Sequence, residues 1–290
     1  MSLAWIRKAH FYDELVTETR YKDLRNFLKN EERMLDILLK NLIKNKEEPI
    51  SLIEVGSGTG RVLFSYMEKP EIWKHLTYLI GIDNSPAMYE IAISKLNEKK
   101  RSRKYRNIKA EIEQKYAFFC MNVLDMNKFF SDGKLNLKAL IDEFGENEFT
   151  SVIDPLKYER STKVVCILLN TLGNIIKDTT ETAAKAREIA INNMVKAAGK
   201  GGKIVVSVFA AESFSSEAPK LYKNVEKLVG KFDENSFDNK KYEFITKTFY
   251  SHWFKRKEVE EMIEKAGCQN PPSCIEIRGK LKGYFFVGNI

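Results

Sequence analysis

The pattern of hydrophobic and polar positions predicts one long helix followed by a series of short buried strands. Between residues 21 and 46, leucine and isoleucine recur every three or four positions, as in Leu24, Leu28, Leu35 and Leu42. This spacing is typical of an amphipathic helix with one buried stripe. From residue 50, short apolar runs alternate with helical patterns, which favours a parallel sheet buried on both faces. We expect its strands at Ser51–Val55, Tyr78–Asp83, Tyr116–Met121, Val164–Leu169 and Lys203–Phe209.

Local signals place helices between these strands. Ser85 followed by Pro86 is typical of an N-cap and the first helical position. Asp178 or Thr179 can cap a second helix, which runs to Ala198 and ends at the glycines 199, 201 and 202. After the fifth strand we expect, in order, a polar stretch at 210–241, a β-like run at 242–254, a helix from 254 to 267, and closing strands at 274–278 and 284–287.

Composition is that of an ordinary globular chain, with 43% hydrophobic and 30% charged residues among 290. No apolar run approaches the ~18 residues that cross a bilayer, and the first residues do not resemble a secretory leader. Among the four cysteines, Cys120 and Cys166 lie in apolar runs, and Cys268 and Cys274 have no second pair nearby. This spacing fits neither a disulfide framework nor a zinc site. We therefore expect a cytoplasmic protein without a metal or membrane segment.

Residues 54–60 read Glu-Val-Gly-Ser-Gly-Thr-Gly, between a predicted strand and a predicted helix. Glycine lets the backbone pass close to a ligand, and the first N–H groups of a helix favour an anion. The spacing G-x-G-x-G, with an acid two residues before it, does not meet the dinucleotide fingerprint G-x-G-x-x-G. It predicts a nucleotide-like ligand.

This segment resembles the first motif of the Rossmann-like S-adenosylmethionine-dependent methyltransferases. Four further segments are similar to later motifs in the family's order: 80–86, 121–125, 168–174 and 201–205. The resemblance implies an α/β fold, doubly wound, with a mostly parallel seven-stranded sheet, helices on both faces and an N-terminal helical cap. It also implies a single methyltransferase domain over residues 1–290, divided into the cap (10–49), a cofactor-binding core (50–209), a substrate-side insertion (210–254) and a C-terminal helix with closing strands (255–290).

The resemblance further implies S-adenosyl-L-methionine as the cofactor. The residues at the matching positions are Glu54, Gly56, Ser57, Gly58, Gly60, Asp83, Asn84, Asn122, Val123 and Asn170. Asp83 stands where the family's acid holds the ribose hydroxyls, and Asn122 and Val123 stand where a side chain and a backbone N–H read the adenine edge. Asn122 replaces a more usual acid and Asn84 a more usual apolar residue, although an amide oxygen can still accept from an exocyclic amine.

Methyl transfer needs proximity and orientation more than a fixed catalytic triad, because the cofactor carries an activated group. If the acceptor must lose a proton, the candidate bases are His252, Tyr12 and Tyr158, and Asn170 is a further candidate at the active site. Tyr12 and Arg20 also suit a polar substrate or the cofactor carboxylate. The turn at 170–174 resembles those of methyltransferases that act on small amines or amino acids. We therefore expect a small-molecule acceptor, an amine or a hydroxyl or carboxylate.

Two alternatives stay open. The net charge is +8, and six positive charges lie within eight residues, at Lys99, Lys100, Arg101, Arg103, Lys104 and Arg106, so that 8 − 6 leaves +2 for the rest. This basic cluster favours an RNA or protein methyltransferase, although Tyr105 is its only aromatic residue and single-strand binders use several. The other alternative is a non-catalytic cofactor-binding or scaffold protein. The sequence leaves the acceptor and the oligomeric state open.

Overall fold

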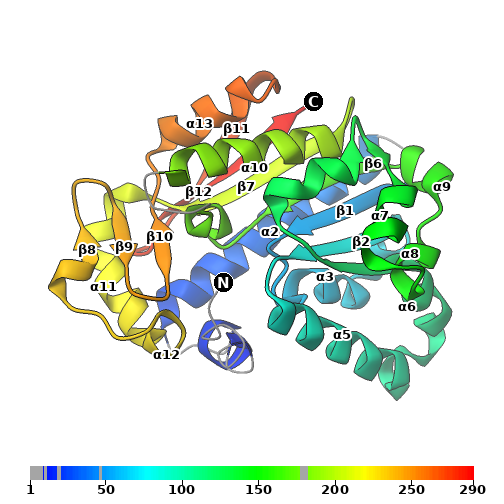
Figure 1. The fold of residues 1–290 in the computed structure, drawn as a ribbon, viewed down its shortest axis with the longest axis horizontal. Coiled ribbons are helices and arrows are strands. Elements are labelled where there is room, and N and C mark those ends of the chain that lie inside the picture. The colour runs from blue at the N-terminus through cyan, green and yellow to red at the C-terminus, as the bar shows by residue number, and fades with distance from the viewer. Residues whose placement is uncertain (1–8, 10–11, 18–20, 46–47, 177–181) are drawn as a thin grey trace. The chain divides into compact units, whose positions relative to one another are not determined.

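A computed structural model describes residues 9, 12–17, 21–45, 48–176 and 182–290 (Figure 1). The predicted long helix is α2 (Lys22–Asn45). Its buried stripe contains Leu24, Leu28, Leu35, Leu39 and Leu42, all at the predicted helical spacing. Arg20 and the predicted caps Asp178 and Thr179 lie outside the described residues.

Seven strands form one sheet, and their order confirms the predicted doubly wound α/β fold. They are β1 (Ile50–Val55), β2 (Leu76–Asp83), β3 (Tyr116–Cys120), β6 (Thr162–Ile167), β7 (Lys203–Phe209), β11 (Gln269–Ile277) and β12 (Gly283–Asn289). The order is β11-β12-β7-β6-β1-β2-β3, and β2 is parallel to both β1 and β3. The order reverses beside β1, and open α/β sheets bind ligands at the carboxyl ends of strands around such a point.

The chain divides into two compact units. The glycine-loop unit contains Leu35–Cys166, Asn193–Ile204 and Asn289–Ile290, and the hairpin unit contains Met1–Met34, Ile167–Asn192 and Val205–Gly288. Both units are discontinuous in sequence, since the chain crosses from one to the other inside the elements at 22–45, 162–167, 183–198, 203–209 and 283–289.

In the glycine-loop unit, β1, β2 and β3 are flanked by short helices (Figure 1). Those between β1 and β3 are α3 (Arg61–Ser65), η3 (Tyr66–Glu68), α4 (Pro70–Trp73), α5 (Pro86–Arg101), η4 (Arg103–Ile108) and α6 (Lys109–Lys115). The remaining elements are η5 (Val123–Lys128), β4 (Phe130–Ser131), β5 (Lys134–Leu135), α7 (Leu137–Phe144), α8 (Glu148–Val152) and α9 (Pro155–Glu159). Ser85 caps α5 as predicted, because its side chain accepts from the backbone N–H of Met88.

In the hairpin unit, the stretch predicted to be simply polar is largely helical. It forms η8 (Ala211–Ser213), α11 (Phe214–Asn224), α12 (Glu226–Val229) and η9 (Glu234–Ser236). The buried residues of α11 include Phe214, Ala218, Leu221 and Tyr222, at spacings of three and four. A helical stripe was thus present, but short and interrupted by polar residues.

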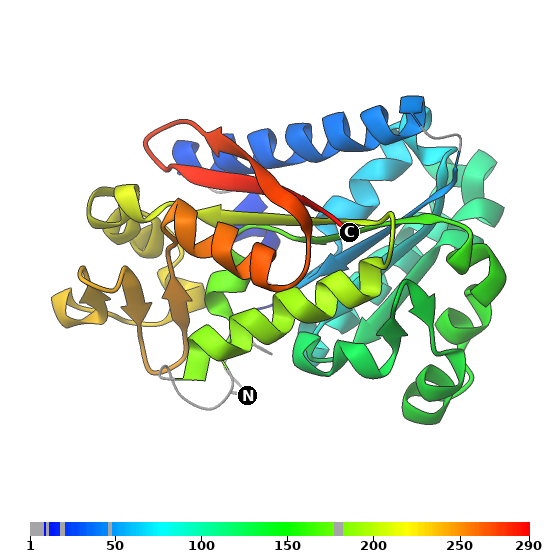
Figure 2. The same ribbon diagram turned by 90° about the horizontal axis from the view of Figure 1, so that it is seen from above.

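The β-like run predicted at 242–254 forms a hairpin. It contains β9 (Glu243–Ile245) and β10 (Tyr250–His252), with β8 (Phe237–Asp238) pairing on the other side of β9. Thr246 N–H donates to the Phe249 carbonyl at 2.8 Å, which closes the polar turn between β9 and β10. The predicted helix before the closing strands is α13 (Arg256–Lys265), which packs on β11 (Figure 2). The helix α10 (Ala183–Ala198) and the short η2 (Asp13–Thr17) and η6 (Thr171–Asn174) complete the described elements.

No described helix is long and apolar enough to span a bilayer. The described ranges also contain no group of three His, Cys, Asp or Glu side chains that could hold a metal ion. All four cysteines are free thiols.

Candidate active site

The glycine loop after β1 has a backbone that only glycine adopts without strain. Gly56, Gly58 and Gly60 have φ angles of 69°, 54° and 80°, in the left-handed region that disfavours a Cβ atom. The N–H groups of Gly56 and Ser57 both donate to the carbonyl of Ile82, at 2.7 and 3.1 Å, which fixes the loop against the end of β2. The alternating glycines are therefore explained by backbone geometry.

Asp83, the last residue of β2, joins this loop through its carboxylate. One oxygen accepts from Gly58 N–H at 2.8 Å and the other from Ser85 N–H at 2.9 Å. Burial raises the pKa of Asp83, although the two backbone hydrogen bonds act in the opposite direction. An ionised carboxylate has about four acceptor positions, so capacity for ligand hydroxyls is left after these two contacts.

The end of β3 forms the third part of the site. Asn122 caps η5, because its Oδ1 accepts from Leu124 N–H at 3.0 Å. Asn193, from the middle of α10, donates through Nδ2 to the carbonyls of Val123 and Leu124, at 2.8 and 3.0 Å. Asn193 is 3% exposed, and its role was missed because it lies 70 residues from Val123 with no motif around it.

The remaining predicted cofactor positions of this unit lie beside these groups in the chain. Glu54 and Ser57 are buried, and Asn84 is exposed. The glycine loop, Asp83 and Val123 thus follow the carboxyl ends of three adjacent strands, β1, β2 and β3. A turn of left-handed glycines and a half-buried acid at the carboxyl ends of adjacent strands together fit a nucleoside with an anionic or polar tail.

Comparison with known proteins shows the family of the chain. A family model described as a methyltransferase domain matches residues 26–271. The chain belongs to the methyltransferase domain family. S-adenosylmethionine is therefore the expected cofactor of this methyltransferase, and the glycine loop, Asp83 and the Asn122–Val123 corner fit it.

Solved structures show the same fold. An S-adenosylmethionine-dependent methyltransferase from Clostridium acetobutylicum has a TM-score of 0.52 and 11% identity, with 98% of each chain covered. A possible histamine N-methyltransferase from Thermotoga maritima has a TM-score of 0.50 and 15% identity, with 99% of each chain covered. The complex of the Haloferax volcanii Trm112 methyltransferase activator with a putative methyltransferase matches with a TM-score of 0.51 and 11% identity, over 99% of this chain and 96% of that one. A search of curated protein sequences finds no significant match.

Asn170 belongs to the hairpin unit, where its amide is fully engaged. Its Oδ1 accepts from Phe209 N–H at 3.0 Å, and its Nδ2 donates to Ser251 Oγ and to the His252 carbonyl, both at 3.1 Å. Asn170 is 1% exposed. It therefore ties the turn after β6 to β7 and β10 of the methyltransferase.

The same turn is strained. Leu169 and Asn170 have φ angles of 50° and 55°, and a leucine in this region is a genuine outlier. The Leu169 N–H donates to Oε1 of Glu31, a completely buried residue of α2, at 2.6 Å. Such strain persists only where surrounding contacts enforce it, and it is often found at functional sites.

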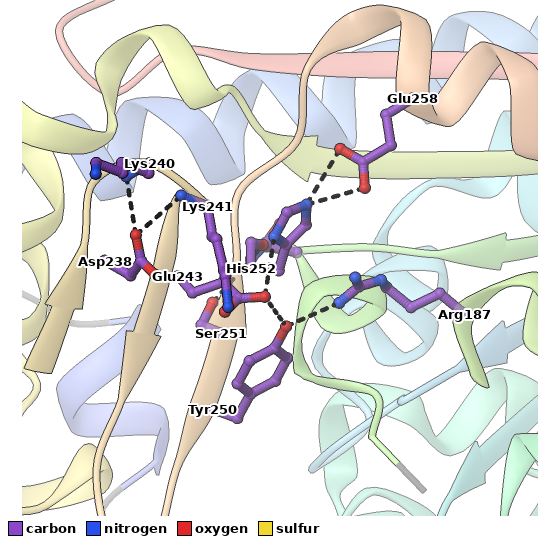
Figure 3. Close-up of polar contacts among 10 residues, drawn as sticks. Arg187, Asp238, Lys240, Lys241, Glu243, Tyr250, Ser251, His252 and Glu258 are labelled. Atoms are coloured by element: carbon purple, nitrogen blue, oxygen red, sulfur yellow. Dashed lines mark hydrogen bonds and ion pairs between the residues drawn. The ribbon is translucent and has the colours of Figure 1, made fainter. Parts of the chain in front are cut away.

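His252 is the candidate base with a carboxylate partner on its ring. Its Nε2 lies 3.0 and 3.1 Å from the two oxygens of Glu258, and its Nδ1 is 3.9 Å from Glu243 Oε1 (Figure 3). The imidazole is 8% exposed. A carboxylate on one ring nitrogen fixes the orientation and tautomer of the other, as in many catalytic pairs.

The two tyrosine candidates, Tyr158 and Tyr12, differ in burial. Tyr158 is completely buried in the glycine-loop unit, and burial raises its pKa far above the ordinary value. A phenol of this kind is a poor base because its anion would be desolvated. Tyr12 is half-exposed and directly precedes η2 in the hairpin unit.

Part of the basic cluster is used within the fold. Lys104 pairs with Glu68 at 2.6 Å, and the Tyr105 hydroxyl donates to the same carboxylate at 2.8 Å. Lys99 lies over the rings of Phe64 and Tyr105, at 5.4 and 5.2 Å, and burial lowers its pKa. Arg101, Arg103 and Arg106 are exposed.

Proposed function

We propose that this methyltransferase transfers the methyl group of S-adenosylmethionine to a small-molecule nucleophile, an amine or a hydroxyl or carboxylate oxygen. The observation that carries the proposal is the buried polar face of the β9–β10 hairpin. Glu243, Tyr250 and His252 share this face, since Tyr250 and His252 alternate along β10 and Glu243 pairs directly opposite His252. A buried polar cluster with few groups suits the orientation of a small polar molecule.

In this proposal the glycine-loop unit holds the cofactor. Asp83 accepts from the ribose hydroxyls, Asn122 and the Val123 backbone contact the adenine, and Gly56, Gly58 and Gly60 allow close approach of the remaining part. When bound, S-adenosylmethionine supplies a methyl group already activated on a sulfonium. The protein contributes orientation and exclusion of water.

We propose His252 as the group that accepts a proton from the acceptor. When Nε2 donates its N–H to Glu258, the lone pair is on Nδ1, which is buried 3.9 Å from Glu243 Oε1. Asn170 acts by positioning, because it holds the carbonyl of His252.

The RNA or protein alternative receives less support. Two of the six cationic residues have partners in the same unit: Lys99 packs over Phe64 and Tyr105, and Lys104 forms a surface ion pair with Glu68. Half-buried Lys100 and exposed Arg101, Arg103 and Arg106 complete the cluster, with no row of aromatic residues on which bases could stack.

Calorimetric titration with S-adenosylmethionine tests the cofactor site first. We expect micromolar binding that Asp83→Ala weakens at least about tenfold, because a charge-assisted hydrogen bond is lost. The matched control is Asp142→Ala, an exposed carboxylate on α7 of the same unit, which should bind as the native protein does. Binding that is indifferent to Asp83, or no binding, would contradict the assignment and favour a scaffold role.

Formation of S-adenosylhomocysteine then tests the acceptor class. We expect turnover with small amines or acids and none with RNA at low or moderate salt. Turnover confined to RNA, falling steeply as salt rises, would instead support the basic cluster as the acceptor surface.

A further inference from the structure

Arg187, in the second turn of α10, is a buried cation that has no acidic partner among the described residues. It is 4% exposed. Its Nη1 donates to the Tyr250 hydroxyl at 3.2 Å, and its guanidinium carbon lies 5.5 Å from the centre of the Phe254 ring. Its Nε is buried without an acceptor in the described part of the chain. Figure 3 shows the side chain reaching from α10 to Tyr250 on β10.

A guanidinium in this position cannot relieve its burial by losing a proton, because arginine keeps its charge at every ordinary pH. Buried charges in proteins are normally paired with an opposite charge or fully hydrogen-bonded. One phenol and one aromatic ring supply only part of what the guanidinium loses on leaving water.

The neighbouring polar groups are already committed to each other. The Tyr250 hydroxyl donates to Glu243 Oε1 at 2.8 Å, which leaves its oxygen lone pair for Arg187. His252 is bound to Glu258 at 3.0 Å. Glu243 and Glu258 each contact a tyrosine or histidine side chain, whereas the buried Nε of the guanidinium has no acceptor among the described residues (Figure 3).

We propose that Arg187 binds a carboxylate of the methyl acceptor, which makes the acceptor a small carboxylic acid. The inference rests on the proposed function and names its substrate class. A carboxylate matches the planar fork of a guanidinium and forms short, charge-assisted hydrogen bonds with it. A dianion such as phosphate fits less well, because Glu243 and Glu258 lie in the same cluster as the single cation.

Thermal melting tests the site without the cofactor. Arg187→Met removes the charge at similar volume, and we expect the full-length variant to melt at the native temperature or above it, since an uncompensated charge is removed. Acetate, benzoate and anthranilate, compared with their amides at equal ionic strength, should raise the melting temperature of the native protein but not of the variant. Arg256→Met is the control, because Arg256 is exposed and its Nε pairs with Glu260 at 2.8 Å.

Kinetics with paired acids and amides test the link to the acceptor. We expect Arg187→Met to raise KM for carboxylic acids about tenfold or more, with the amides unaffected and the S-adenosylmethionine Kd unchanged. Arg187→Lys keeps the charge but lacks the planar fork of the guanidinium. Its KM for carboxylic acids should lie between those of the native protein and Arg187→Met. Tyr250→Phe, which leaves the guanidinium in place, should retain the carboxylate preference.

Three results would overturn the inference. Melting of Arg187→Met several degrees below the native protein would show a structural cation. Equal stabilisation of both proteins by carboxylates would place the anion elsewhere. Loss of S-adenosylmethionine affinity in the variant would assign Arg187 to the cofactor's own carboxylate. Failure of the native protein to bind S-adenosylmethionine would contradict the proposed function instead, and the melting comparison would still decide the anion site.

Discussion

The candidate sites of the two units consist of different chemical groups. In the glycine-loop unit the site is mainly backbone: three glycines with positive φ and one carboxylate that accepts two N–H groups. In the hairpin unit it is a set of side chains from α10, the β9–β10 hairpin and α13, joined by hydrogen bonds across as many as 63 residues of sequence. A site formed by the backbone depends on consecutive residues and can be recognised in the sequence. A side-chain cluster brings together residues that are distant in the sequence and forms only when the chain folds. The following substitutions test whether the units differ in this way, from the largest expected effect to the smallest.

Asn170→Ala should have the largest effect, through stability. It leaves the Phe209 N–H, the His252 carbonyl and Ser251 Oγ without their partner. At about 1 to 3 kcal/mol for each unsatisfied buried group, we expect a loss of about 3 kcal/mol or more in the free energy of unfolding in urea.

The matched control is Asn174→Ala, an exposed asparagine in the same turn. Asn170→Gly removes the amide but also relieves the strain of the left-handed backbone. Its comparison with Asn170→Ala separates the contribution of the amide hydrogen bonds from that of the backbone strain. A loss below about 1 kcal/mol for Asn170→Ala would show that the amide contacts do not stabilise the hairpin unit.

Gly60→Ala tests the backbone site. A Cβ atom at Gly60 would lie 2.6 Å from Phe64 Cε2, whereas one at Gly145, with a similar φ of 76°, has nothing within 4 Å. Alanine at Gly60, with ψ of 16°, incurs about 1 to 2 kcal/mol of left-handed strain, and the clash adds about 1 to 3 kcal/mol. Alanine at Gly145, with ψ of 168°, has no clash but lies in a backbone region that is essentially restricted to glycine, which costs about 1 to 3 kcal/mol.

We expect Gly60→Ala to lose cofactor binding in a calorimetric titration, while Gly145→Ala binds normally. Adding Phe64→Leu should restore part of the stability of Gly60→Ala, because it removes the clash but not the strain. No recovery of stability on adding Phe64→Leu to Gly60→Ala would mean that the ring of Phe64 moves aside freely.

The pH dependence of cofactor affinity reports on Asp83. Its pKa is raised by burial, so its protonation on acidification begins at a higher pH than for an ordinary carboxyl. Since the ionised form is the better acceptor, affinity should be constant above the raised pKa and fall by up to about tenfold per pH unit below it.

The stability of the protein without cofactor should respond to pH in the opposite direction. A raised folded-state pKa means that the folded chain holds this proton more tightly than the unfolded chain, so protonation of Asp83 favours folding at acid pH. Asp83→Asn should remove the cofactor-linked pH response in the range where Asp83 titrates, above the ordinary pKa of a carboxyl. The same slope in that variant would assign the titration to another group.

Charge removal from the basic cluster should have the smallest effect. We expect the triple variant Arg101→Ser, Arg103→Ser and Arg106→Ser to change cofactor Kd and small-acceptor KM by less than about twofold, as exposed charges contribute little. Lys99→Met, by contrast, removes a cation that lies over the Phe64 and Tyr105 rings and should lower the melting temperature. A large loss of activity in the triple variant would move the acceptor site to this cluster.

Sequence reasoning captured the elements whose signal is local. The α2 stripe, the Ser85 cap and the five core strands follow from periodicity, burial and capping chemistry, which act over a few residues. The α11 helix was missed because its stripe is short. The turn that divides the β-like run at 242–254 into β9 and β10 was not located, because it contains no glycine or proline.

The sequence by itself determined the fold class, the family and the position of the glycine loop, because glycines with positive φ and an acid at a strand end are encoded in adjacent residues. Only the tertiary structure decided that Asn193 supports the Val123 corner, that Asn170 is held inside the hairpin unit, and that Arg187 is buried without an acidic partner among the described residues. These contacts join residues far apart in the chain, and their partners are chosen by packing and by the need to satisfy buried polar groups.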